Sequence, residues 1–469
     1  MRRLSKDYRE NVEMLDSVLR VRENFDVLKK VLTVGQDELT LYYIDGFIKD
    51  GIMSKVIIYF LSLKNTSDSA DGFLTSHVPY VEAETTEDLD EMIKMTLSGA
   101  ALVLGSSFSD KAIIIDAREY PARPTAEPEN DRVMRGSRDG FVETLIFNTA
   151  LIRRRIRDTA LTMKYTSVGK CSKTDIIICY LEDRADPRLV KKVTKLISEI
   201  ETDSLTMGVE SLKECIIKSR WYNPFPKVRY TERPDAAAAH LYEGNVLVLC
   251  DNSPQVMVLP TTVFDFLQET NDFYFPPLTG SYIRFVRHMV FLLTLFLVPV
   301  WFLLIKNPSV VPEWLRFIIP DEVGKIPIFA QILLVEFVID GLRMASMNTP
   351  DMLANSLSVV GALILGDFAV GIGWLIPEVI LYMAFVAIAN FTQSSYELGY
   401  AFKFFRIGLL VLIQLFNWWG LLAGVLIIIL LLATNPTVTG TRGYLYPLIP
   451  FSGKKLLSLF FRVKKKDNE

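Results

Sequence analysis

Two long uncharged apolar runs near the C-terminus constrain the fold of this chain more than any other feature. Met289–Ile305 contains 17 residues and Leu409–Ala433 contains 25 residues, all without a charged side chain. An α-helix rises about 1.5 Å per residue and the hydrocarbon core of a bilayer is about 30 Å thick, so both runs with their flanks are long enough to cross it. We therefore expect both runs to be transmembrane helices.

Two further apolar tracts lie between these runs. Ile326–Ile339 is apolar except for Gln331 and Glu336, and Val359–Asn390 is interrupted by charged, glycine and proline residues. The second tract is too long for one straight span and too short for two. We expect it to contribute one span and a broken, re-entrant or interfacial segment near Asp367, which is itself a candidate pore or intramembrane polar residue. Such a segment has to face a cavity or a neighbouring chain, because lipid cannot satisfy its backbone groups.

The distribution of basic residues predicts the orientation in the membrane. Lys and Arg gather on the cytoplasmic side of membrane proteins. The N-terminus has no apolar core of a secretory signal and the C-terminal segment KKLLSLFFRVKKKDNE is basic, so both are expected on the cytoplasmic side. The number of crossings should then be even, and four satisfy it. Five spans are the alternative if the C-terminal segment lies outside.

The charged residues divide the chain into two parts. Residues 284–469 hold 15 of the 51 Lys and Arg and 11 of the 54 Asp and Glu, which leaves 36 and 43 for residues 1–283. The first part is acidic and repels phosphate backbones, so we expect no binding to nucleic acid. Its four cysteines lack C-x-x-C spacing and give neither a zinc pattern nor a clear disulfide framework.

The first part predicts a soluble α/β domain of two lobes. Apolar residues at helical spacing from Asp7 to Leu32 predict an amphipathic helix or helix pair. Short β-branched runs then alternate with helical segments, and the proline-containing Tyr120–Asn130 divides them into two groups. We therefore predict an N-terminal helix region at 1–34, lobe 1 at 35–120, lobe 2 at 121–283, an all-α transmembrane domain at 284–435 and a basic cytoplasmic tail at 436–469.

Motifs for catalysis or cofactor binding are absent from the sequence. The three histidines show no H-E-x-x-H spacing, and the sequence contains no G-x-S-x-G and no Walker A motif. We therefore expect no enzyme activity, no cofactor and no metal site.

Polar side chains inside the apolar region are the first group of candidate functional residues. Each is costly in lipid and is therefore functional or paired. Glu336 and Asp340 are four residues apart and Arg343 lies three beyond Asp340, so all three share one helix face. They either form an internal ion pair that holds helices together or line a water-filled path that selects cations. Gln414 and Asn417 either form interhelical hydrogen bonds or line a pore.

A basic segment of the acidic first part, RGSRDGFVETLIFNTALIRRRIRD at Arg135–Asp158, supplies the second group. We interpret it as a helix with Asp139 as N-cap, an apolar stripe and an exposed basic end, where the helix dipole favours cations. An Arg–carboxylate network between lobes or subunits is the preferred role, and recognition of an anionic ligand or lipid headgroup is the alternative. The stripe consists of Val142, Leu145, Ile146, Thr149, Ile152 and Ile156. The residues expected at the interface are Glu127, Arg135, Arg138, Glu143, Arg154 and Arg155.

The same segment resembles the A subunits of the GerA family of bacterial spore germinant receptors. EPENDRVMRGSRDGFVETLIFNTALIRRRIRD, from Glu127, is similar to the family pattern E-P-x-x-E-x-x-x-R-G-P-R-E-G-F-x-E followed by R-R-R-I. Ser137 replaces the usual proline, and Asp131 and Asp139 stand at acidic positions. LPTTVFDFLQETNDFYFPPLTGSYIRFVRHM resembles the junction into the first span, and SLSVVGALILGDFAVGIGWLIPEVI the glycine-rich membrane stretch. Within the family, SMNTPDMLANSLSVVGALILGDFAV and VAIANFTQSSYELGYAFKFFRI are most similar to a sporulation-stage relative of the receptor A subunits.

The resemblance implies a protein of the spore inner membrane with its soluble domain on the cytoplasmic side. It further implies a ring-shaped homo-oligomer, a pentamer, that conducts monovalent cations during germination together with a small membrane partner protein. A non-conducting subunit that docks onto receptor or dipicolinate-channel complexes is the alternative.

Overall fold

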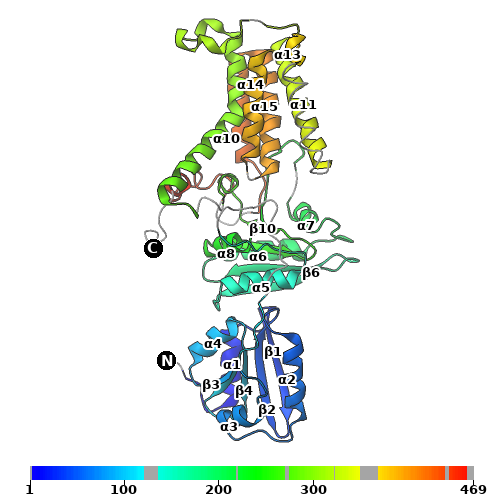
Figure 1. The fold of residues 1–469 in the computed structure, drawn as a ribbon, viewed down its shortest axis with the longest axis vertical. Helices are drawn as coiled ribbons and strands as arrows, with labels where there is room; N and C mark the ends of the chain where they lie inside the picture. The colour runs from blue at the N-terminus through cyan, green and yellow to red at the C-terminus, as the bar shows by residue number, and fades with distance from the viewer. Residues whose placement is uncertain are drawn as a thin grey trace. The chain divides into compact units, whose positions relative to one another are not determined.

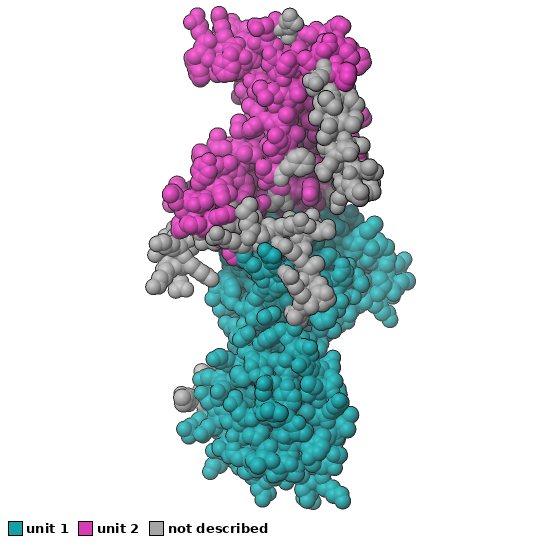
Figure 2. Space-filling view, viewed as in Figure 1, with its two compact units in different colours: residues 1–218, 228–261, 437–442 teal, residues 219–227, 262–436, 443–469 magenta. Residues whose placement is uncertain are grey.

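The computed structural model describes residues 3–120, 136–217, 220–269, 274–321, 323–348, 368–393, 395–438 and 443–461. The chain forms two compact units, coloured separately in Figure 2. Unit 1 comprises residues 1–218, 228–261 and 437–442, and unit 2 comprises residues 219–227, 262–436 and 443–469. Both β-sheets belong to unit 1, and the long apolar helices belong to unit 2.

The first lobe of unit 1 combines helices with a five-stranded sheet (Figure 1). Its strand order is β1-β2-β4-β5-β3. Its elements are α1 (Tyr8–Val18), β1 (Val27–Val34), β2 (Asp37–Ile44), α2 (Asp50–Ser62), α3 (Ala70–His77), β3 (Ala83–Thr86), α4 (Leu89–Leu97), β4 (Ala101–Gly105) and β5 (Ala112–Ile115).

The second lobe contains another five-stranded sheet, with the order β6-β7-β9-β10-β8. Its elements are α5 (Leu145–Arg155), β6 (Leu161–Val168), β7 (Thr174–Leu181), α6 (Pro187–Ser198), α7 (Val209–Ile216), β8 (Arg229–Thr231), α8 (Pro234–Tyr242), β9 (Val246–Cys250) and β10 (Val256–Leu259). Both lobes have the same order of helices and strands along the chain and the same order of strands in the sheet. They are therefore two copies of one topology.

Two predictions about unit 1 need correction. We expected a helix or helix pair up to Leu32, and this prediction was wrong for residues 27–32. These residues belong to β1, which pairs along its whole length with β2. Apolar residues at 27, 28, 31, 32 and 34 fit either period, and pairing with β2 decides between them. The two sheet-containing lobes followed by helices are confirmed, but all the described strand pairs are antiparallel, so the lobes are α+β rather than α/β.

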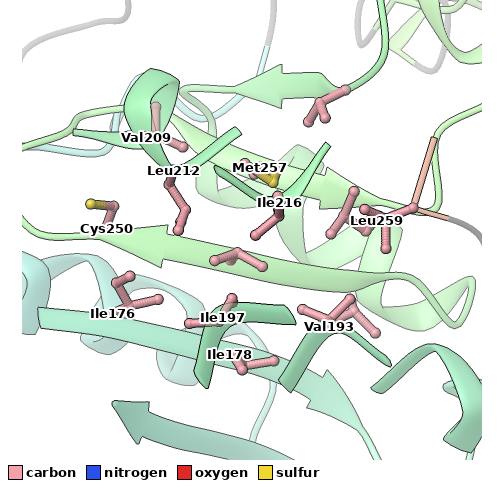
Figure 3. Close-up of a cluster of buried hydrophobic side chains, with 14 of the residues drawn as sticks. Ile176, Ile178, Val193, Ile197, Val209, Leu212, Ile216, Cys250, Met257 and Leu259 are labelled. Carbon is pink, nitrogen blue, oxygen red and sulfur yellow. The ribbon is translucent and has the colours of Figure 1, made fainter. Parts of the chain in front are cut away.

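The core of the second lobe lies on both faces of its sheet. On one face, Val193 and Ile197 of α6 and Leu212 of α7 pack against strand residues such as Ile178 and Met257 (Figure 3). On the other face, α5 and α8 pack against the alternate residues of the same strands. Burial on both faces explains why the central strands are continuous apolar runs rather than alternating ones.

The regular elements described in unit 2 are all helices. The long ones are α10 (Pro277–Lys306), α11 (Ile328–Asn348), α14 (Pro377–Phe391), α15 (Tyr396–Phe416) and α16 (Trp418–Ala433). By length and composition, α10 and α15 are long and apolar enough to cross a membrane, whereas Pro377–Asn390 and α16 are shorter apolar helices. Short elements complete the unit, namely η1 (Val263–Leu267), η2 (Pro308–Val310), η3 (Glu313–Ile318), α13 (Ala369–Gly371) and α17 (Gly453–Phe460).

The apolar run Leu409–Ala433 is not the single helix that we expected. The chain turns at Asn417, whose φ is 54°, and α16 packs back along α15. Asparagine adopts a positive φ more readily than most residues. A Cβ atom at Gly420 would lie 2.0 Å from the carbonyl oxygen of Leu412, and one at Gly424 would lie 2.4 Å from Leu409 Cδ2. The close approach of α15 and α16 therefore requires glycine at both positions.

Candidate functional site

Four charged side chains of unit 2, three of them buried and one partly exposed, form a cluster that we call the charge quartet. Glu336 and Asp340 come from α11, and Lys403 and Arg406 come from α15. Arg406 Nη2 lies 2.5 Å from Glu336 Oε1, and Arg406 Nε donates to the same oxygen at 2.6 Å. Lys403 forms an ion pair with Asp340, and its Nζ lies 3.7 Å from Glu336 Oε2. The spacings of four residues in α11 and three in α15 place each pair on one helix face, so the two pairs can meet.

The charges of the quartet balance each other. The side chains of Glu336 and Arg406 are 4% and 1% exposed, whereas that of Asp340 is 31% exposed. Removing one member of such a buried pair leaves its partner charged without compensation, which costs about 3–5 kcal/mol. Loss of Glu336 or Arg406 would therefore destabilise the packing of the surrounding apolar helices.

The quartet also connects a third helix through backbone oxygens. Arg406 Nη1 donates to the carbonyl oxygen of Thr294 in α10 at 2.8 Å, and Lys403 Nζ donates to that of Glu336 at 3.1 Å. These hydrogen bonds occupy donors that the carboxylates do not reach. α10, α11 and α15 therefore share one polar contact inside an apolar unit.

Sequence reasoning found the two acids of the quartet but missed its two bases. One alternative paired Glu336 and Asp340 with Arg343, and the described ion pairs of the two acids also include Lys403 and Arg406. The guanidinium of Arg343 lies 5.4 Å from the centre of the Tyr400 ring. The spacing of three residues between two cations in an otherwise apolar segment is the signal that could have identified the bases.

Gln414 and Asn417 lie at the end of α15, away from the quartet. Asn417 Nδ2 donates to Asn307 Oδ1 at 3.0 Å, and Asn307 Nδ2 donates to Asn417 Oδ1 at 2.7 Å. Lys306 Nζ donates to the carbonyl oxygen of Gln414 at 2.8 Å, where a cation compensates the unpaired carbonyls of a helix end. Asn417 and Arg406 are 11 positions apart, or about 16 Å along a helix. Lys306 Nζ also donates to Gln414 Oε1 at 3.4 Å, so both side chains form hydrogen bonds to the end of α10, in agreement with one of the two alternatives.

The remaining intramembrane candidate, Asp367, lies outside the described residues. Gln331, a polar exception in the apolar tract Ile326–Ile339, is buried, and its side chain is fully hydrogen-bonded. Its Oε1 accepts from Ile376 N at 2.9 Å, and its Nε2 donates to the carbonyl oxygen of Ile326 at 2.7 Å. Gln331 thereby fixes the start of α14 against α11.

The arginine helix of unit 1 is shorter than we predicted. α5 begins at Leu145 with Thr144 at the N-cap, so Asp139 is not the cap. Asp139 instead accepts hydrogen bonds from Arg155 at 2.6 and 2.7 Å. Burial alone would raise the pKa of Asp139, but hydrogen bonds from Arg155 and Ser137 outweigh it and hold the pKa below its ordinary value. This carboxylate accepts hydrogen bonds from an arginine at the end of the helix rather than from the N–H groups at its start.

We expected the whole basic end of α5 to be exposed, but the structure buries part of it. Arg153 is completely buried, and its Nε and Nη2 donate to the two oxygens of Asp26 at 2.7 and 2.9 Å. Asp26 precedes β1 of the first lobe and α5 belongs to the second, so this pair joins the lobes. Of the predicted stripe, Leu145, Thr149, Ile152 and Ile156 are buried, whereas Ile146 is 38% exposed.

The other predicted interface residues are spread over the surface of unit 1. Arg138, Glu143 and Arg154 are exposed, and the guanidinium of Arg154 lies 4.7 Å from the centre of the Tyr120 ring. Glu127 and Arg135 lie outside the described residues. The structure thus brings Arg155 to Asp139, and it shows that sequence reasoning missed Arg153 as the connection between the lobes.

Comparison with known proteins identifies a family that the chain matches. The family model described as Bacillus/Clostridium GerA spore germination protein matches residues 13–469. The chain is 39% identical over 468 residues to Stage V sporulation protein AF of Bacillus subtilis (strain 168), covering 99% of this chain and 94% of that protein. It is 26% identical over 453 residues to Spore germination protein KA of the same organism, covering 94% and 82%.

A solved structure also resembles part of the chain. The N-terminal domain of the A subunit of the Bacillus megaterium spore germinant receptor GerK3 matches with a TM-score of 0.40 and 18% identity, over 55% of this chain and 96% of that one. The expected similarity to a sporulation-stage relative is confirmed by Stage V sporulation protein AF. Because the family model spans nearly the whole chain, this protein belongs to the GerA family of spore germination proteins.

Proposed function

We propose that this chain is a membrane-spanning subunit of an oligomeric channel in the spore inner membrane, which releases monovalent cations and so amplifies germination. Membership of a spore germination family supports the biological setting. The apolar α10 and α15 support insertion into lipid, because helices satisfy all their backbone groups internally. Unit 1 then lies on the cytoplasmic side.

The charge quartet is the observation that carries this proposal. Ionisable side chains within apolar helices are rare, and they mark ion pathways or structural pairs. Different members of the quartet fit these two roles. Glu336 is buried against Arg406 and fixes α11 to α15, whereas Asp340 is partly exposed and can contact a passing cation. Asp367 remains a second proposed carboxylate of the path.

The channel we propose is assembled from several copies of this chain. A pentameric ring places one quartet from each subunit around the path, and the basic residues of α5 hold neighbouring copies of unit 1 in register. Arg138, Arg154 and Glu143 are exposed and therefore available for such contacts. A small membrane protein and other germination proteins are the further partners that we propose.

A second candidate function is a non-conducting subunit that docks onto receptor or dipicolinate-channel complexes. The observation that favours it is the balanced charge of the quartet, because two acids paired with two bases within one chain suffice to hold helices together. In that case the carboxylates have no role in ion passage.

Ion conductance of quartet variants in planar bilayers separates the two functions. The substitution Asp340→Asn keeps Glu336 within 3.7 Å of Lys403, so the lysine retains a counterion and the helices remain packed. The channel proposal predicts a conducting wild-type protein and a severalfold lower cation conductance in the variant. Glu378→Gln, at the first turn of α14, is the matched control and should conduct as the wild type does.

The double substitution Glu336→Ala with Asp340→Ala should lower the cation flux further while unit 1 remains resistant to proteolysis. Exchange of the buried pair, Glu336→Arg with Arg406→Glu, tests the structural role by itself. If the chain is an assembly subunit, we expect none of these proteins to conduct ions. We then also expect the exchange of Glu336 and Arg406 to recover germination. Equal conductance of the wild type and Asp340→Asn would contradict the path through Asp340.

A further inference from the structure

A groove in the second lobe runs between an edge strand and a helix. β6 is the outermost strand of its sheet, and α6 packs on the sheet face that carries Lys164 and Tyr180. The cavity between them has a volume of about 510 Å³. Its lining includes Lys164, Tyr180, Ala185, Lys191, Thr194 and Lys195. The groove lies within unit 1, so a ligand that binds there does not depend on the proposed channel.

The chain itself occupies the first half of the outer edge of β6. Phe25 N donates to the carbonyl oxygen of Met163 at 3.0 Å, and Met163 N donates to Asn24 Oδ1 at 2.9 Å. Arg153 Nη2 donates to the carbonyl oxygen of Leu161 at 3.4 Å. A segment next to β1 therefore pairs with this edge as a short additional strand does.

The second half of the same edge offers further pairing positions. Alternate residues of a strand direct their N–H and C=O groups to the same side, so Tyr165 and Ser167 direct theirs outward as Met163 does. Both residues are exposed, and the part of the chain that the structure describes contributes no hydrogen bond to these outward groups. Lys164, which directly precedes Tyr165 in β6, lines the groove together with Ser198 at the end of α6.

The helix that forms the other wall is basic. α6 has the sequence PRLVKKVTKLIS, with four basic residues and no acidic one, in a part of the chain where acids exceed bases by 43 to 36. Lys195 lies 3.5 Å from Glu199 at the exposed surface, and the Lys164 ammonium lies over the Tyr180 ring. The acid of the groove, Glu182, already pairs with Arg20 at 3.2 Å. The groove therefore presents lysines to whatever enters it.

We propose that this groove binds an extended acidic segment of a partner protein, which adds to β6 as a further strand. Main-chain hydrogen bonds to an exposed edge supply affinity in this mode, and alternate side chains enter the groove and supply specificity. Here Lys164, Lys191 and Lys195 contact the carboxylates of the segment, and Tyr180 and Ala185 form the apolar floor. A membrane surface can meet the lysines of α6, but it cannot pair with a strand edge.

The test measures binding of a fluorescent, N-acetylated eight-residue peptide of alternating glutamate and valine to the full chain in detergent. We expect the wild type to bind it and not to bind a peptide of alternating lysine and valine. Ser167→Pro removes one outward N–H at a position where an edge strand tolerates proline, and it should raise the Kd by roughly tenfold or more. Lys191→Glu with Lys195→Glu should have at least the same effect.

Lys170→Glu is the matched control, because Lys170 is an exposed lysine in the turn after β6, outside the groove. This variant should bind the peptide as the wild type does. Circular dichroism and the thermal unfolding midpoint verify that the variants remain folded. The proposal is overturned if the wild type does not bind the acidic peptide, or if Ser167→Pro binds it unchanged. Binding of phosphatidylglycerol vesicles that depends on the lysines but not on Ser167 would show a membrane-binding helix instead.

Discussion

At the scale of single residues, buried charges are the most informative side chains of this protein. Arg153 and Asp26 form a buried pair between the two lobes, and Arg406 and Glu336 form another among the helices of unit 2. In both cases an arginine reaches a carboxylate of another element and a backbone oxygen as well. Such pairs fix one arrangement of their elements, because a misplaced partner leaves a buried charge.

The pair between the lobes yields the first prediction. Arg153→Met leaves Asp26 buried without a counterion and should destabilise unit 1 by about 3–5 kcal/mol. Arg154→Met removes an exposed neighbour on the same helix and should cost less than about 1 kcal/mol. Amide hydrogen exchange of unit 1 within the full chain measures the loss of stability in both variants. Equal protection in the two variants would contradict the role of the buried pair, whereas addition of Asp26→Leu to Arg153→Met should recover most of the loss.

Asp139 yields a prediction about pH. Its folded-state pKa lies below the ordinary value, which is about 3.9, because hydrogen bonds from Arg155 and Ser137 outweigh the opposing effect of burial. The carboxylate therefore stabilises the folded chain above that pH, and this contribution is lost as the pH falls through the lowered pKa. Between pH 6 and pH 3 the urea midpoint of the wild type should fall more steeply than that of Asp139→Asn. Parallel curves would show that Arg155 contributes nothing.

Sequence reasoning at this scale identified acids more readily than their partners. Glu336 and Asp340 interrupt an apolar helix, so their cost in lipid draws attention to them. Lys403 and Arg406 were missed because cations in a segment between apolar runs are also typical of a loop at the membrane surface. Only the packing of α11 against α15 shows that these cations are buried.

At the scale of elements, the hairpin of α15 and α16 shows what periodicity cannot supply. Every face of an all-apolar run looks the same, so hydrophobicity alone does not locate a turn within it. The turn is encoded by Asn417, which takes a positive φ, and by the glycines that let two backbones approach. Strand β1 was missed for a related reason, since its short apolar pattern fits a helix until its partner strand is known.

Gly420 tests this account of the hairpin. Gly420→Ala places a methyl group 2.0 Å from the carbonyl oxygen of Leu412, so α16 has to move away and the thermal unfolding midpoint in detergent should fall. Overpacking of this kind costs about 1–3 kcal/mol. Gly408→Ala in α15 is the control, since its Cβ meets nothing within 4 Å. A control that loses as much stability as Gly420→Ala would refute the close packing at Gly420.

At the scale of the whole molecule, unit 1 consists of two copies of one topology. β1 and β6 occupy equivalent edges of their sheets, and residues just before β1 pair with the outer edge of β6. Composition and motif order predicted the two lobes and the helical region. The duplication was not visible in the sequence, because strand order depends on contacts between distant segments.

Oligomer formation gives the prediction at this scale. Arg154 is exposed at the end of α5, whereas Arg155 already pairs with Asp139 in its own chain. If the basic end of α5 holds neighbouring subunits in register, Arg154→Glu should shift the mass measured by light scattering in detergent toward the monomer. Lys170→Glu reverses another exposed charge of unit 1 and should leave the mass unchanged. An unaltered oligomer in Arg154→Glu would exclude Arg154 from the subunit contact.

The central proposal is that unit 2 crosses a membrane with unit 1 on one side, and labelling of single exposed cysteines tests it most directly. With the exposed Cys171 and Cys215 replaced by serine, Trp314→Cys and Met207→Cys each add one exposed thiol, in units 2 and 1 respectively. In intact cells an impermeant maleimide should label Trp314→Cys, which follows α10, and should label Met207→Cys only after the membrane is permeabilised. Identical labelling of both variants before and after permeabilisation would place both positions on one side and would contradict a membrane-spanning α10.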